Sequence, residues 1–118
     1  NLGANIAQLI PALDTVGLRR DSTVMAVLPF FHIYGMNVLL NSCLYMRAHV
    51  VTMPSFDLEK FLAAHQKHGI TFTFIAPPMA IAMAKGPEID ASWFADSKLM
   101  VSSAAPSRAR RDCRVCGW

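Results

Sequence analysis

Apolar residues fall into two kinds of run along the chain. Short runs rich in β-branched and aromatic residues predict strands over residues 23–29, 48–53, 70–75 and 98–102. The first of these, TVMAVLP, has no polar alternation, which is typical of a strand buried on both faces of a parallel sheet. Proline ends the first two runs and follows the third after one alanine, so each strand is followed by a change of chain direction.

The segments between these runs have helical spacing. Helices are predicted over residues 1–12, 33–47, 56–68 and 79–85, and a helical turn over 90–96; we expect the first to begin upstream of Asn1. Asp57 suits the N-cap of the third helix and Gly69 suits its C-terminal stop. Strands that alternate with helices indicate right-handed βαβ crossovers. The sequence therefore predicts an α/β fold, with a mainly parallel sheet and flanking helices.

The composition is apolar for an independent domain. Of the 118 residues, 53% are hydrophobic and 16% charged, whereas about a quarter are usually charged. Either the chain lies near a membrane or further polypeptide covers its surfaces. The longest apolar stretch, residues 36–46, is interrupted by polar residues and is shorter than the roughly 20 residues that a membrane span needs. We expect no membrane span, and, since no secretory signal opens the sequence, a cytoplasmic location.

The positive charge belongs to the last twelve residues. Residues 1–106 carry seven basic and seven acidic side chains, whereas 107–118 carry four arginines and one aspartate. Basic residues are not spread over a face with aromatics between them, so no nucleic-acid partner is expected. Cys113 and Cys116 lack the further ligands that zinc needs, so no metal site is predicted. We expect 107–118 to be a divergent, disordered basic tail that follows a truncation or frame shift after Pro106.

Candidate chemistry gathers where the predicted strands end, because ligands of open α/β sheets bind at the carboxyl ends of the strands. His32 follows the first strand, and two readings stay open: a ligand contact, or a ring bonded to a backbone carbonyl. Tyr34 can offer its hydroxyl to a ligand or be an interfacial tyrosine with a wet oxygen. The small-residue turn 102–106 allows close approach of a flat ligand, or is an ordinary tight connection.

The other histidines predict no further site, and the sequence contains no phosphate-binding loop. His65 and His68 are interpreted as a solvated helix end rather than a metal site, although His65 also falls on the apolar face of its helix. Cys43 is expected to be a small buried hydrophobe. No glycine-rich phosphate loop and no Gly-x-Ser-x-Gly motif occurs. The sequence therefore contains no recognisable motif for phosphate or acyl chemistry by this chain alone.

Four linked segments resemble one enzyme family. In order they are LPFFHIYGMN (28–37), VTMPSFDLEKFL (51–62), ITFTFIAPPMAIAMAK (70–85) and KLMVSSAAP (98–106). Together they resemble the adenylate-forming, acyl-activating enzymes, especially 4-coumarate–CoA ligases and similar acyl-CoA ligases, over residues 1–106. The resemblance implies that a carboxylic acid reacts with ATP to give an acyl-adenylate, from which CoA displaces AMP. It implies Mg²⁺ and CoA as further cofactors, and a small aryl or fatty acid as substrate.

The resemblance also implies roles for single residues. His32 matches the histidine beside the acyl carboxylate and is the candidate catalytic residue. Candidate substrate-binding residues are Tyr34, Val38, Ser103 and Ala104, and candidate cofactor-binding residues are Ser55, Ala105 and Pro106. Three positions depart from the pattern: Val38 stands where the coumarate enzymes often have serine, Ser55 where they often have a lysine near CoA, and Ser103 where glycine is usual. The resemblance therefore implies a weakened or absent CoA contact at Ser55, and with the apolar Val38 it does not imply a phenolic substrate.

The family's phosphate loop, its Tyr-Gly-x-Thr-Glu segment, its ribose-binding aspartate and its C-terminal catalytic domain find no counterpart in the sequence. We therefore predict that residues 1–106 are an incomplete piece of the large N-terminal AMP-binding domain. As a fragment it would contribute part of the acid pocket, bind no cofactor tightly and be inactive alone. The alternative is a non-catalytic α/β remnant that binds a ligand or a partner.

Overall fold

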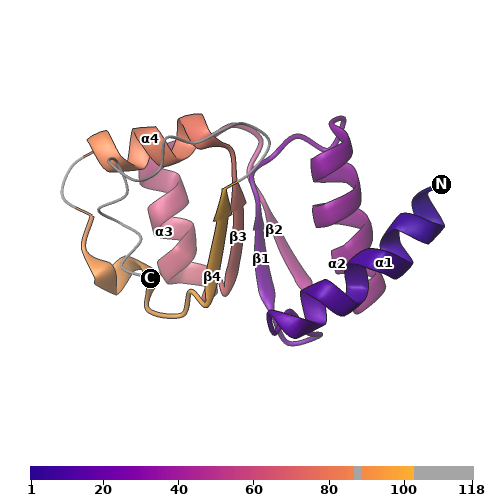
Figure 1. Cartoon of the computed structure of the whole chain (residues 1–118). Coiled ribbons are helices and arrows are strands. Elements are labelled where there is room, and N and C mark those ends of the chain that lie inside the picture. Colours follow the sequence, from indigo (N-terminus) through magenta and orange to yellow (C-terminus); the bar gives the residue numbers. More distant parts are fainter. Residues whose placement is uncertain (87–88, 103–118) are drawn as a thin grey trace.

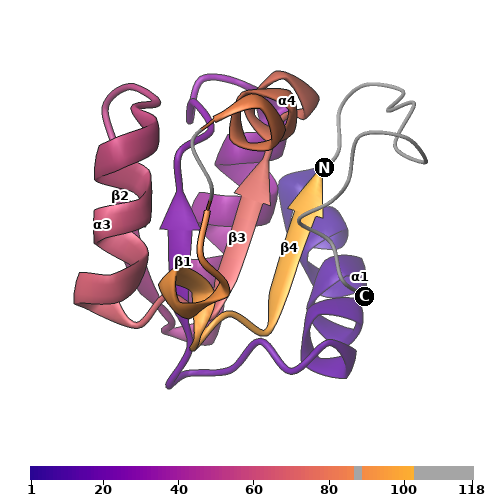
Figure 2. The same cartoon turned by 90° about the vertical axis from the view of Figure 1, so that its left-hand side faces the viewer.

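The computed structural model describes residues 1–86 and 89–102. Its centre is a sheet of four parallel strands, as predicted, with the order β2-β1-β3-β4. The strands are β1 (Thr23–Ala26), β2 (His49–Thr52), β3 (Phe72–Ile75) and β4 (Leu99–Ser102). The arrows of β1, β3 and β4 run side by side in the same direction (Figure 2), and β2 pairs parallel with β1. All four carboxyl ends therefore lie at one edge of the sheet.

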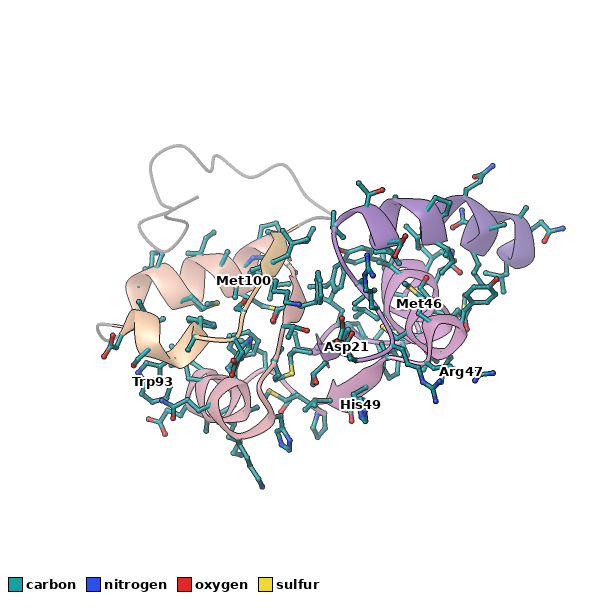
Figure 3. The ribbon with its side chains drawn as sticks, turned by 90° about the horizontal axis from the view of Figure 1, so that it is seen from below. Asp21, Met46, Arg47, His49, Trp93 and Met100 are labelled. Atoms are coloured by element: carbon teal, nitrogen blue, oxygen red, sulfur yellow. The ribbon has the colours of Figure 1, made fainter. Side chains whose placement is uncertain are left out.

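Helices cover both faces of the sheet (Figure 1). One face carries α1 (Leu2–Thr15), the π-helix η1 (Tyr34–Asn41) and α2 (Ser42–Met46). The other carries α3 (Leu58–His68), α4 (Pro77–Lys85) and the 3₁₀ turn η2 (Ala91–Phe94). Figure 3 shows Trp93 and Met100 in one half of the molecule and Met46 and Arg47 in the opposite half. Within the described residues, no helix combines the length and apolarity needed to cross a bilayer.

Alternation along the strands divides the core into two clusters. In β1, Val24 and Ala26 pack on the α1 side, and Met25 packs on the α3 side. In β3, Phe72 and Phe74 follow the first face and Ile75 the second. Side chains of successive strand residues point to opposite faces, so a strand without polar alternation supplies apolar contacts to both. Cys43 is fully buried in the first cluster, as predicted, and burial raises the pKa of its thiol to about 11.

Local signals of α3 are confirmed. The Asp57 carboxylate accepts the backbone N–H of Lys60 at 3.0 Å, which satisfies one of the free N–H groups at the start of the helix. Gly69 ends the helix with a φ of 57°, where glycine has no side-chain strain. By contrast α2 ends at Arg47 with a φ of 58°, a conformation that is unfavourable for a residue with a Cβ.

The region after β1 differs most from the prediction. The strand ends at Ala26 instead of Pro29, because the chain bends at Leu28 towards η1; Pro29 itself has no N–H to extend the ladder. The helix predicted over residues 33–47 is present but divided into a π-helical part, η1, and a short α-helix, α2. The predicted tail over 107–118 lies outside the described residues.

Candidate functional site

The carboxyl edge of the sheet brings the predicted segments to the same side. The loop with His32 follows β1, the loop with Ser55 follows the neighbouring β2, and Ala76 follows β3. Ser102 ends β4, and the predicted site residues that come next, Ser103, Ala104, Ala105 and Pro106, lie outside the described residues. The site can therefore be built from the ends of β1 to β3 and the helix that starts there.

His32 holds the turn between β1 and η1. Its backbone N–H donates to the Pro29 carbonyl at 3.2 Å, and its carbonyl accepts the N–H of Met36 at 2.9 Å. Its ring Nδ1 accepts the backbone N–H of Tyr34 at 3.2 Å, which leaves Nε2 free to donate. The side chain is exposed. The imidazole thus caps the start of η1 and still presents one ring nitrogen to solvent or to a ligand.

Gly35 allows η1 to start so close to the turn. A Cβ built on this buried residue would overlap the Pro29 carbonyl oxygen and lie 2.9 Å from the Pro29 carbonyl carbon. These atoms are backbone and cannot rotate away, so only glycine fits. The close approach determines where Tyr34, the preceding residue, enters the core.

Tyr34 packs its ring against the sheet. The ring meets Phe74 of β3 edge to face, with 6.3 Å between the centroids and an angle of 81°. This geometry is favourable for two aromatic rings. The hydroxyl is buried and has no hydrogen-bond partner. A buried hydroxyl without a partner costs free energy, and none of the described residues supplies one to this oxygen.

An open hollow of about 360 Å³ lies between the starts of α1 and η1. Its lining consists of Asn1, Leu2, Asn5, Ile33, Tyr34, Asn37 and Val38. Tyr34 and Val38 are one helical turn apart and both contribute, as expected from their spacing. The volume is within the range of small-molecule sites, and the lining is mostly apolar with a few polar groups.

Asn37 is the polar group that sequence reasoning missed. Its side-chain NH₂ donates to the side-chain oxygen of Asn5 on α1, and its backbone carbonyl accepts the Ser42 hydroxyl at 2.8 Å. The residue is only 4% exposed, and its Oδ1 has no hydrogen-bond partner. A polar residue three positions after Tyr34 in an apolar helix was the available signal. Only the packing of α1 against η1 shows that it is buried beside the hollow.

The predicted site residues are partly brought together. Tyr34 and Val38 share the hollow, and His32 is bonded to the Tyr34 backbone but does not line it. Ser55 is exposed in the loop between β2 and α3 and makes no contact with the hollow. Within the part of the chain that the structure describes, sequence reasoning thus selected two lining residues and a capping residue, and missed Asn5 and Asn37.

The described residues do not fit a metal-bound triphosphate. No lysine, arginine, histidine or carboxylate side chain lines the hollow. In residues 1–86 and 89–102, no group of three or more His, Cys, Asp or Glu side chains could hold a metal ion. Phosphate groups need cations or several backbone N–H donors. An uncharged group that can bond to the Tyr34 hydroxyl fits this lining better.

Comparison with known sequences identifies relatives. The family described as "AMP-binding enzyme" matches residues 1–115. Probable 4-coumarate–CoA ligases 1 and 2 of Dictyostelium discoideum are each 37% identical, over 94 and 106 residues. These matches cover 80% and 90% of the chain but 17% and 19% of the ligases. The chain thus spans less than a fifth of the length of these relatives.

Solved structures share the fold. ATP-bound MatB from Rhodopseudomonas palustris superposes with a TM-score of 0.78 at 24% identity, over 89% of this chain and 20% of MatB. O-succinylbenzoate–CoA synthetase (MenE) from Bacillus subtilis, in complex with ATP and magnesium, gives 0.70 at 16% identity, over 85% of this chain and 20% of MenE. Sequence family and fold agree: the chain belongs to the AMP-binding enzyme family and matches part of an acyl-CoA ligase.

Proposed function

We propose that this chain is the part of an ATP-dependent carboxylic acid–CoA ligase that contributes one wall of the acid pocket. The observation that carries the proposal is the hollow of about 360 Å³ lined by Tyr34 and Val38, in a chain 37% identical to probable 4-coumarate–CoA ligases. The parent enzyme would convert an aryl or fatty acid with ATP into an acyl-adenylate, and then into an acyl-CoA. Its cofactors would be ATP, Mg²⁺ and CoA, and its proposed location is the cytoplasm.

Within this proposal the residues have separate tasks. The Tyr34 hydroxyl, which has no partner among the described residues, donates a hydrogen bond to an uncharged polar group of the bound acid. Val38, one helical turn after Tyr34, makes that part of the wall apolar. It therefore favours an acid without a polar group at that point. His32 Nε2 can donate to the acid's carboxylate, because its Nδ1 already accepts the Tyr34 N–H. These contacts hold the acid but do not supply the phosphate and metal chemistry.

The chain alone is therefore proposed to be inactive. The test is acid-dependent exchange of labelled pyrophosphate into ATP, with a panel of aryl and fatty acids and the 118-residue chain as the enzyme. We expect no exchange above the acid-free background. Exchange by this chain alone would refute the proposed inactivity.

A longer protein tests the ligase assignment. The coding sequence on both sides of this segment is determined, and the extended protein is assayed for exchange and for acyl-CoA formation. We expect activity, and expect Tyr34→Ala to raise the KM for the acid at least about tenfold, the loss of one or two hydrogen-bond and packing contacts. Tyr45→Ala, an exposed tyrosine on α2, is the matched control. An extended protein that binds acids but gives no exchange would favour a non-catalytic binding remnant.

A further inference from the structure

His65 is a buried histidine with both ring nitrogens bonded. Its side chain is 3% exposed, on the face of α3 that packs on the sheet. Nδ1 lies 2.8 Å from the Phe61 carbonyl oxygen, and Nε2 lies 2.8 Å from the Thr73 hydroxyl of β3. A carbonyl can only accept, so Nδ1 carries the proton, and Nε2 of the neutral ring accepts the threonine O–H. The expectation that His65 belongs to a solvated helix end is therefore wrong, although His68 is exposed.

The ring also joins three elements. The centroid of His65 is 4.4 Å from that of Phe61 on the same helix and 4.9 Å from that of Phe94 in η2. Together with the bond to Thr73, these contacts connect α3, η2 and β3 through one imidazole. Any change in the charge of that ring acts on all three elements at once.

No charged side chain among the described residues is bonded to His65. The strand β3, Phe72–Ile75, has no ionisable residue. The ionisable neighbours of α3 are its half-buried N-cap Asp57, the exposed residues Glu59, Lys60, Lys67 and His68 on the helix, and the exposed residues Asp90, Asp96 and Lys98 around η2. Asp96 lies beside Gly69, beyond the C-terminal end of α3. A protonated His65 would thus be a buried cation without a carboxylate partner.

Burial therefore favours the neutral ring. Desolvation lowers the pKa of His65 below its usual 6.5, and the hydrogen bond to Phe61 offsets this only in part. The unfolded chain binds its proton at the usual pKa, so it holds more protons than the folded chain in mildly acidic solution. The neutral, buried His65 therefore contributes to the free energy of unfolding. This contribution is fully present above pH 6.5 and is lost as the pH falls below that value.

We propose that the His65–Thr73 contact is a pH-dependent conformational switch, which in mild acid releases α3 and η2 from β3. Protonation places a hydrogen on Nε2, so the Thr73 hydroxyl must rotate and accept instead of donating. The reversed bond does not neutralise the charge, and the ring remains a buried cation without a carboxylate partner. The buried cation is hydrated when the helix moves away from the strand. The cluster beneath α1, η1 and α2 contains no histidine and keeps its packing.

Backbone hydrogen exchange of the whole chain tests this switch. Exchange is measured by mass spectrometry at about pH 7.5 and about pH 5.5 and corrected for the intrinsic pH dependence. We expect peptides from α3 and η2 to exchange up to about tenfold faster at the lower pH, and those from α1 and β1 to change much less, since one proton taken up on opening gives at most tenfold per pH unit. Equal acceleration in both halves, or none in α3, would overturn the proposal.

Two variants separate His65 from the other histidines. His65→Gln keeps a side chain that can bond to Thr73 but cannot titrate in this range, and it should abolish the acid acceleration. His68→Gln, three residues along the same helix and exposed, should leave it unchanged. If His65→Gln does not fold, the proton NMR titration of the wild-type His65 ring decides. A midpoint below 6.5 supports the switch, and a midpoint at or above 6.5 contradicts it.

Discussion

Two buried hydroxyls on opposite faces of the sheet differ in one respect. Thr73, on the α3 face, is bonded to His65. Tyr34, which packs on Phe74 from the η1 face, has no partner, and Asn37 beside it has an unpaired Oδ1. Buried polar groups are nearly always paired in folded proteins. Among the described residues, the Thr73 hydroxyl of the α3 face is paired, whereas the Tyr34 hydroxyl and Asn37 Oδ1 of the η1 face have no partner.

The helices on the two faces differ in the same way. On one face α3 has a side-chain N-cap and a glycine stop. On the other, the N-cap residue of η1, Ile33, makes no side-chain hydrogen bond, and only the His32 ring accepts the first N–H. The helix winds as a π-helix and continues into α2, which ends at Arg47 with a positive φ. π-Helical segments are rare and are often found at functional sites. The regular helix α3 therefore lies on the face without the candidate site, whereas the irregular η1 and α2 lie on the face that holds it.

The largest effect is expected where η1 meets the β1 turn. Gly35→Ala places a methyl group against the Pro29 carbonyl, and since backbone must move to make room, we expect a loss of about 3 kcal/mol in the free energy of unfolding. Urea titration of the whole chain, followed by circular dichroism, measures this. Gly3→Ala on α1 is the control, because its Cβ meets nothing closer than 3.6 Å. Equal effects of both variants would show that η1 is not held by this close approach.

An intermediate effect is expected from the paired hydroxyl. Thr73→Val keeps the shape of the side chain but leaves His65 Nε2 buried without a partner. We expect a loss of about 1 to 2 kcal/mol at neutral pH, the cost of an unsatisfied buried group. The same urea titration checks it. An unchanged midpoint would mean that the α3 face gains nothing from its polar pair.

The smallest effect should have the opposite sign. Tyr34→Phe removes a hydroxyl that is buried without a partner, so we expect the chain to gain about 0.5 to 1 kcal/mol in the free energy of unfolding. Tyr45→Phe on α2 is exposed and should change little. A loss of stability in Tyr34→Phe would show that this hydroxyl is already bonded, and the contrast between the two faces would disappear.

Much of the architecture follows from the sequence alone. Four apolar runs, separated by segments of helical spacing, predicted a parallel sheet with flanking helices, and Asp57 and Gly69 predicted the two ends of α3. Both kinds of signal are local: they depend on the side-chain period and on the backbone preferences of one or two residues. The resemblance of four linked segments also indicated the family, because order and spacing are properties of the sequence.

Only the tertiary structure decided which polar groups are paired. The order of the strands, the π-helical winding of η1, the bond between Asn5 and Asn37 and the bond between His65 and Thr73 all join segments whose meeting depends on packing. Burial gives a side chain its cost or benefit, and burial is determined by neighbours from distant parts of the chain. For this reason the sequence shows His65 and Tyr34, but only the packing of the helices shows that the His65 ring is paired and the Tyr34 hydroxyl is not.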